Sequence, residues 1–131
     1  MIVLDTHTWV WWMCAPENLP TRAREEIDRQ LALRSVIVST FSTWEVAMLI
    51  AKDRLQFSVD LAEWIKQSER IPGLAFQPVT NAIALASVSL PGQFHPDPAD
   101  RLIVATARVL GAALVTGDAK IRAYAHVRTL W

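Results

Sequence analysis

The stretch that decides the fold comes first: "MIVLDTH" at residues 1–7, where the apolar residues Ile2 to Leu4 run directly into Asp5. A short apolar run with β-branched residues predicts a strand that is buried on both faces, with Asp5 at its carboxyl end. In open α/β sheets, ligands bind at that edge. An aspartate after a strand also often caps a turn or a helix, so the role of Asp5 depends on the residues that join it.

Beyond this stretch, short apolar runs alternate with helical patterns along the chain. Stripes of apolar residues predict one helix after Pro20 and another after Ser58, and Gly111 is expected to end a third. This alternation predicts an α/β fold, with a central parallel sheet of about five strands flanked by helices in three layers (α/β/α). The further strands are expected near Val36–Val38, Ala75–Pro78, Ala113–Thr116 and Val127–Leu130.

The composition indicates a single domain over residues 1–131, long enough to bury a core without disulfides. Cys14 is the only cysteine, which suits a reducing compartment. The chain shows neither a secretory signal pattern nor an apolar run that could span a bilayer, so we expect a cytoplasmic protein with no membrane contact. Thirteen basic and thirteen acidic residues cancel, so any nucleic-acid binding must depend on local basic patches or bound metal.

A second acidic residue follows the next predicted strand. In "VIVSTFSTWE" (residues 36–45), a strand leads into a helix start, and Glu45 falls about one turn into that helix. Ser42 and Glu45 also fit the S-x-x-E capping box, in which the glutamate only satisfies backbone N–H groups. Taken alone, Glu45 is better interpreted as part of a cap.

Two more candidates stand at later junctions. In "HPDPADRLIVATARVLG" (residues 95–111), Asp97 before Pro98 predicts a helix cap, and Asp100 lies on the first turn, from which it can project toward the sheet edge. In "ALVTGD" (residues 113–118), Asp118 follows a strand and a turn glycine. Gly117 and Asp118 alternatively form only a tight turn before the next helix.

Four carboxylates at one sheet edge, those of Asp5, Glu45, Asp100 and Asp118, would repel one another. At an effective dielectric constant near 20, two carboxylates about 4 Å apart oppose each other by roughly 4 kcal/mol. A divalent cation removes that cost. Oxygen ligands without a cysteine or histidine cluster favour Mg²⁺ or Mn²⁺ over zinc, and phosphodiester hydrolysis is the natural chemistry of such a site.

The histidines and tryptophans receive structural interpretations. His7 and His95 are each more typical of ordinary hydrogen-bonding residues than of metal ligands. Most of the six tryptophans are expected in the core, but the cluster of Trp9, Trp11 and Trp12 suggests that one exposed ring meets a partner.

Four motifs together resemble one family. These are "IVLDTHTWVWW" (2–12), "VSTFSTWEVAMLIAKDRL" (38–55), "LPGQFHPDPADRLIVATA" (90–107) and "LVTGD" (114–118). In this order and spacing they resemble the motifs of PIN-domain ribonucleases, specifically the VapC-type toxins of bacterial toxin–antitoxin pairs. The resemblance implies a PIN-like fold, metal-dependent RNA cleavage in Mg²⁺ or Mn²⁺, and neutralisation by a cognate antitoxin.

The resemblance also assigns roles. The four carboxylates named above form its acidic quartet, in which Asp5 and Asp100 bind the principal metal directly. Glu45 and Asp118 act directly or through water and help to orient the attacking water, while Thr6 and Thr116 are candidates to hydrogen-bond these carboxylates. We expect a homodimer that also binds the antitoxin.

Three alternatives remain at this point. A PIN-type nuclease of RNA processing would carry the same residues. A receiver-like signalling domain also gathers acids at such an edge and binds Mg²⁺, but it would place paired acids after the first strand and a lysine after a late one, where this chain has Asp5-Thr6-His7 and Asp118. A non-catalytic binding module would not need the quartet.

Overall fold

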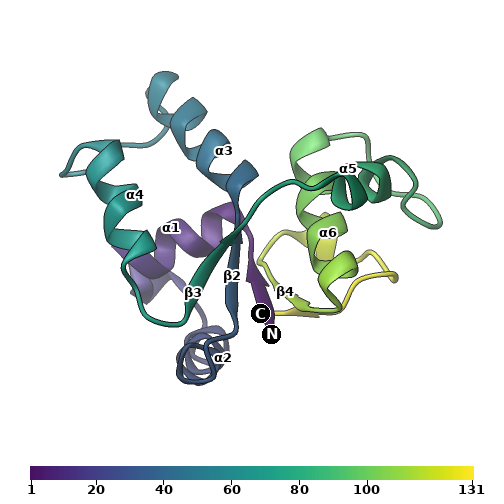
Figure 1. The fold of residues 1–131 in the computed structure, drawn as a ribbon, viewed down its shortest axis with the longest axis horizontal. Coiled ribbons are helices and arrows are strands. Elements are labelled where there is room, and N and C mark those ends of the chain that lie inside the picture. The colour runs from purple at the N-terminus through teal and green to yellow at the C-terminus, as the bar shows by residue number, and fades with distance from the viewer.

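The computed structural model describes all residues from Met1 to Trp131 and is built on one five-stranded sheet (Figure 1). All strand pairs are parallel, and the strand order is β3-β2-β1-β4-β5. The strands are β1 (Ile2–Leu4), β2 (Val36–Ser39), β3 (Leu74–Gln77), β4 (Ala113–Val115) and β5 (Thr129–Leu130). The predicted fold class is therefore confirmed.

Helices connect and cover the strands. They are α1 (Thr6–Cys14), the 3₁₀ helix η1 (Pro16–Asn18), α2 (Thr21–Ala32), α3 (Thr40–Ala51), α4 (Leu61–Glu69), α5 (Asn81–Val88), α6 (Pro98–Leu110) and α7 (Ala119–Arg122). Helices α1, α2 and α4 lie on one side of the sheet and α5 and α6 on the other (Figure 1). This arrangement gives the three layers expected from the alternating pattern.

The sheet separates two apolar clusters because side chains alternate between its faces. In β1, Ile2 and Leu4 join the cluster under α1, α2 and α4, whereas Val3 joins the cluster under α5 and α6. All three side chains of this strand are buried. A central strand that is covered on both faces has no polar positions, which explains the uninterrupted apolar run of the sequence.

Several predicted element boundaries are correct, with small shifts at the strand ends. Helix α2 begins at Thr21, and Gly111 ends α6 with a left-handed φ of 65°. Strand β3 stops before Pro78, which has no N–H to donate to the ladder. Strand β5 is shorter than predicted, although the Leu114 N–H still donates to the Arg128 carbonyl, one residue before the assigned strand.

None of the three clustered tryptophans is fully exposed, and a contact of one of them with a partner stays a prediction. Trp9 is completely buried against Trp64 and Phe76, and Trp11 and Trp12 are partly buried against the same cluster. These neighbouring residues are distributed around helix α1, most of whose surface is covered. The most exposed tryptophan that the structure shows is instead Trp44 on α3, at 53%.

None of the helices is long and apolar enough to cross a membrane.

Candidate active site

The strand order places a switch point between β1 and β4, where successive connections leave the sheet in opposite directions. In open parallel sheets, a crevice forms at the carboxyl ends of such strands. The two strand ends are tied together here: the Asp5 backbone N–H donates to the Val115 carbonyl at 3.2 Å, and the Thr8 hydroxyl donates to the same oxygen at 3.0 Å. Asp5 and Asp118 follow the two adjoining strands.

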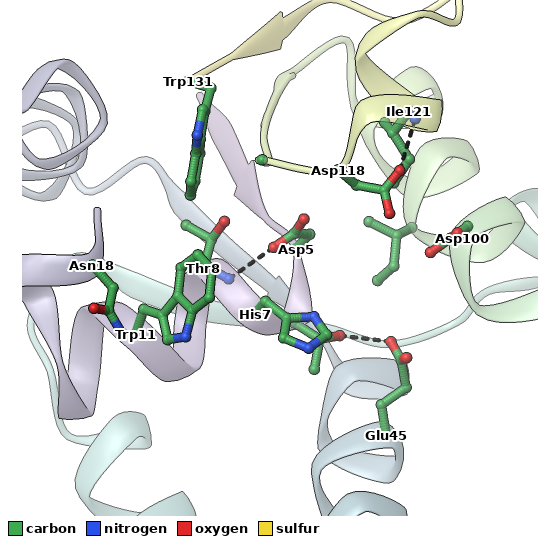
Figure 2. Close-up of a pocket in the computed structure, with 13 residues that line it drawn as sticks. Asp5, His7, Thr8, Trp11, Asn18, Glu45, Asp100, Asp118, Ile121 and Trp131 are labelled. Carbon is green, nitrogen blue, oxygen red and sulfur yellow. Dashed lines mark hydrogen bonds between the residues drawn. The ribbon is translucent and has the colours of Figure 1, made fainter. Parts of the chain in front are cut away.

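A pocket of about 490 Å³ lies at this edge, and the acidic quartet lines it (Figure 2). Asp5 comes from the β1–α1 junction, Glu45 from α3, Asp100 from the first turn of α6 and Asp118 from the junction before α7. Four residues separated by up to 113 positions thus surround one cavity. The lining includes no lysine or arginine.

Asp5 and Asp118 each cap a helix with a single oxygen. Asp5 Oδ1 accepts a hydrogen bond from the Thr8 N–H at 2.8 Å. Asp118 Oδ1 accepts from the N–H groups of Lys120 at 2.9 Å and Ile121 at 3.0 Å. Cap and ligand are therefore not exclusive roles, because the second carboxylate oxygen of each residue is left for the pocket.

Asp97 is a cap, as the sequence predicts. Its Oδ1 accepts from the N–H groups of Ala99 at 2.9 Å and Asp100 at 3.2 Å, with Pro98 at the first helical position. The side chain is exposed and does not line the pocket.

The capping-box interpretation of Glu45 is wrong. Helix α3 begins at Thr40, and its cap is Ser39, whose hydroxyl accepts from the Phe41 N–H. Ser42 is buried, and Glu45 lies beyond the first turn of the helix. The motif has the right spacing, but helix α3 starts at Thr40, two residues before Ser42, so Ser42 lies inside the helix and is not its N-cap.

Glu45 is oriented instead by Thr6. The Thr6 hydroxyl donates to Glu45 Oε1 at 2.6 Å and lies 2.9 Å from the Ser42 hydroxyl. Burial raises the pKa of the Glu45 carboxyl above its ordinary value, and the charges of Asp97 and Asp5 add to the rise, against the opposing hydrogen bond from Thr6. Thr6 thus hydrogen-bonds a carboxylate of the quartet, as expected. Thr116 instead accepts a hydrogen bond from the Asp118 backbone N–H at 3.1 Å, and its hydroxyl donates to none of the four carboxylates in the structure.

Asp100 carries the stronger perturbation. Burial raises its pKa to about 6, with further increases from the negative charges of Asp97, Asp118 and Glu45. His95 lowers it, and His95 Nε2 lies 3.1 Å from Asp100 Oδ2. That nitrogen is buried but not aligned for a hydrogen bond, so the contact is chiefly electrostatic. The interpretation of His95 as an ordinary loop residue missed this contact, which no pattern in the sequence indicates.

Arg101 fixes the loop that carries His95. Its guanidinium donates to the carbonyl oxygens of Ser87 at 2.8 Å, Phe94 at 3.0 Å and His95 at 3.3 Å. These bonds fasten the loop that precedes Asp100 to the end of α5. The sequence analysis did not identify this role.

The donor set fits a hard divalent cation, although the carboxylates do not converge on one point. No three histidine, cysteine, aspartate or glutamate side chains lie close enough to hold an ion together. The set nevertheless consists of carboxylate oxygens, and the pocket lining contains no lysine or arginine. Burial raises the pKa of Asp100, and the negative charges of Asp97, Asp118 and Glu45 add to the rise. Mg²⁺ suits this spacing because it usually keeps several waters and binds through few carboxylates.

The opposite wall of the pocket is aromatic. Trp11, Trp131, Asn18 and His7 also line the pocket. Of these residues, His7 lies on the near side, beside Glu45, whereas Trp11, Trp131 and Asn18 lie across Asp5 from it (Figure 2). We call Trp11 and Trp131 the aromatic wall. Trp131 and Asn18 carry no motif, so the sequence analysis did not place them at the site.

Comparison with known proteins identifies relatives across the whole chain. The family model described as PIN domain matches residues 2–127. Ribonuclease VapC22 of Mycobacterium tuberculosis is 35% identical over 133 residues, which cover 99% of this chain and 98% of that protein.

Two solved structures share the fold. VapBC2 from Rickettsia felis, bound to a promoter DNA fragment, has a TM-score of 0.74 at 15% identity, covering 99% of this chain and 98% of that chain. FitAcB from Neisseria gonorrhoeae has a TM-score of 0.70 at 20% identity, covering 100% and 97%.

The raised pKa of Asp100 predicts a pH-dependent stability in metal-free solution. The folded state binds this proton more tightly than the unfolded state, so stability is lost as the pH rises from 3.8 through about 6. Asp100→Asn should therefore be more stable than wild type at pH 7 by on the order of 1 kcal/mol after solvent screening. The difference should shrink as the pH falls toward 4. Urea unfolding in EDTA at both pH values measures it, with Asp28→Asn on the exposed face of α2 as the control. An unchanged difference between the two pH values would contradict the origin assigned to it.

Proposed function

The chain belongs to the PIN-domain family, and from this membership we propose that it is a VapC-type ribonuclease that hydrolyses RNA phosphodiester bonds. The observation that carries the proposal is the gathering of Asp5, Glu45, Asp100 and Asp118 around one pocket at the carboxyl edge of a parallel sheet. The full-length similarity to a protein named as a ribonuclease supports the same reaction class. Family membership removes the receiver-like alternative.

We propose that the quartet holds Mg²⁺ or Mn²⁺, with Asp5 and Asp100 as direct ligands. Glu45 and Asp118 take part directly or through water. A bound divalent ion supplies the positive charge that the pocket lacks, lowers the pKa of a coordinated water and stabilises charge on the leaving oxygen.

The remaining chemistry belongs to the protein's own side chains. Thr6 fixes one oxygen of Glu45, which leaves Oε2 to orient the attacking water and accept its proton. Burial raises the pKa of Glu45, which suits a group that must accept a proton near neutral pH. His95 and Arg101 hold the first turn of α6, and with it Asp100, against the pocket.

We propose that an antitoxin neutralises the protein. The solved structures that share this fold are described as VapBC and FitAB complexes, several of them bound to DNA, and one as a toxin-antitoxin complex. This context favours a toxin over a nuclease of RNA processing. Induced expression in a bacterium tests it: wild type should arrest growth, Asp5→Asn should not, and co-expression of a cognate antitoxin should relieve the arrest.

A homodimer also remains a proposal, on a different surface from the one that the sequence suggested. Leu85 and Val88 on α5 are 72% and 81% exposed, and exposed apolar side chains on one helix are typical of an interface. Light scattering should give the mass of a dimer for wild type and a smaller mass for Leu85→Glu. Leu33→Glu, at an exposed site beyond α2, is the control. A monomeric wild type at high concentration would contradict the dimer.

Purified protein should cleave RNA in Mg²⁺ or Mn²⁺ and stop in EDTA. Asp5→Asn and Asp100→Asn should lower the rate by at least about 10- to 100-fold, the loss typical even of outer partners of a metal site. Asp28→Asn should keep the rate of wild type. Gel analysis of labelled single-stranded and structured RNA measures the cleavage, and persistence of cleavage in EDTA would overturn the metal dependence.

Metal binding should also stabilise the fold. At a free ion concentration about 100 times the dissociation constant, binding to the folded state alone adds roughly 2.7 kcal/mol, which raises the melting temperature by several degrees. The shift should be largely lost in Asp5→Asn and Asp100→Asn. It should persist in Asp97→Asn, because asparagine still caps α6. An equal shift in all these variants would mean that the quartet does not bind the ion.

A further inference from the structure

The pocket must obtain its affinity for RNA from something other than side-chain cations. Its lining contains four carboxylates and no lysine or arginine, and the formal net charge of the chain is zero. A divalent ion offsets the phosphate charge only on the side of the quartet. The uncharged side of the pocket is therefore the part available to contact the nucleobases.

Trp131 on that side lies directly over the backbone before Asp118. Strand β5 pairs with β4, and Trp131 follows β5 immediately. A Cβ on Gly117 would stand 2.7 Å from Cε2 and Cζ2 of Trp131, closer than real contacts allow. The indole thus covers Gly117, and the absence of a side chain there lets the ring approach Asp118.

Trp11 extends the same wall from α1. Its ring centroid lies 6.1 Å from that of Trp131, with 43° between the planes, and 6.1 Å from the ring of His7. The tilt leaves no parallel slot between the indoles, so a flat ligand would stack on one of them and meet the edge of the other. Asn18, at the end of η1, is exposed beside them and can both donate and accept hydrogen bonds (Figure 2).

Both rings of this wall pack against the core cluster under α1 on one side, but neither is enclosed by it. Trp9 shows what a core tryptophan looks like in this protein: it is completely buried, and its indole N–H donates to Ser68. Trp11 and Trp131 are partly exposed and line the same cavity as the quartet. Aromatic faces beside a phosphate-directed site are the usual means of binding unstacked bases of single-stranded RNA.

We propose that Trp11 and Trp131 form a nucleobase-binding subsite, on which a base next to the scissile phosphate stacks, with Asn18 contacting its edge. This subsite rests on the proposed function: because only an unpaired base can stack there, it would give the ribonuclease a preference for unpaired RNA. Stacking of one base on such a platform is expected to strengthen binding about tenfold.

The first test uses nucleosides, which carry no phosphate and require no metal. In ¹⁵N-labelled protein, the six indole N–H groups are separate NMR probes, and Trp11→Phe and Trp131→Phe assign two of them. Adding adenosine or cytidine in EDTA should shift the Trp11 and Trp131 signals in a saturable way. The Trp44 signal should not move, although Trp44 is 53% exposed and lies outside the pocket. Absence of saturable shifts, or equal shifts at Trp44, would overturn the proposal.

The second test compares RNA with and without the base. In the Asp100→Asn background with EDTA present, where cleavage is suppressed, fluorescence anisotropy measures binding of a short single-stranded RNA and of its counterparts with one abasic position. The intact RNA should bind about tenfold more tightly than one of these counterparts. Trp131→Leu should abolish the preference for intact over abasic RNA, whereas Trp44→Leu should keep it. If the two variants show the same preference, the subsite is overturned.

The two proposals fail separately. Nucleoside shifts without RNA cleavage would support the subsite and refute the nuclease. Cleavage without nucleoside shifts would do the opposite.

Discussion

The site depends on one kind of interaction: an aspartate between a strand and a helix caps the N-terminus of that helix. Asp5 and Asp118 each use one oxygen to hold the first N–H groups of the following helix. The cap fixes the side chain at the sheet edge, and the partial positive charge of the helix N-terminus favours a carboxylate there. Because β1 and β4 are hydrogen-bonded neighbours, the two caps bring two carboxylates to one pocket through backbone geometry alone.

Glu45 and Asp100 reach the pocket in a different way, and they carry the electrostatic cost. Both belong to helices rather than to caps, and burial raises the pKa of both carboxyls. Thr6 donates a hydrogen bond to Glu45, and His95 lies beside Asp100 and lowers its pKa. The site thus combines two carboxylates that backbone N–H groups stabilise with two whose burial is offset only in part by Thr6 and His95, which is the imbalance that a divalent cation would correct.

The sequence predicted the sheet well because each strand is an apolar run between turn signals. The strand register and the three layers follow because apolar side chains on both faces of the sheet must be buried. It also placed Asp5, Asp100 and Asp118 at strand or helix junctions, since short-range motifs determine caps. It failed where the outcome depends on contacts distant in sequence. Ser42 and Glu45 have the spacing of a capping box, but both lie inside a helix that starts at Thr40. The place of Trp131 in the aromatic wall depends on the packing of its ring against Gly117.

The central claim, that the quartet of Asp5, Glu45, Asp100 and Asp118 binds one divalent-metal centre, is tested most directly by crystals grown with Mn²⁺. Anomalous difference density recorded near the manganese absorption edge should show a peak inside the pocket, at coordinating distance from Asp5 and Asp100. The same experiment on Asp100→Asn should give a weaker peak or none. A pocket without anomalous density in wild type, at Mn²⁺ concentrations that support RNA cleavage, would contradict the account.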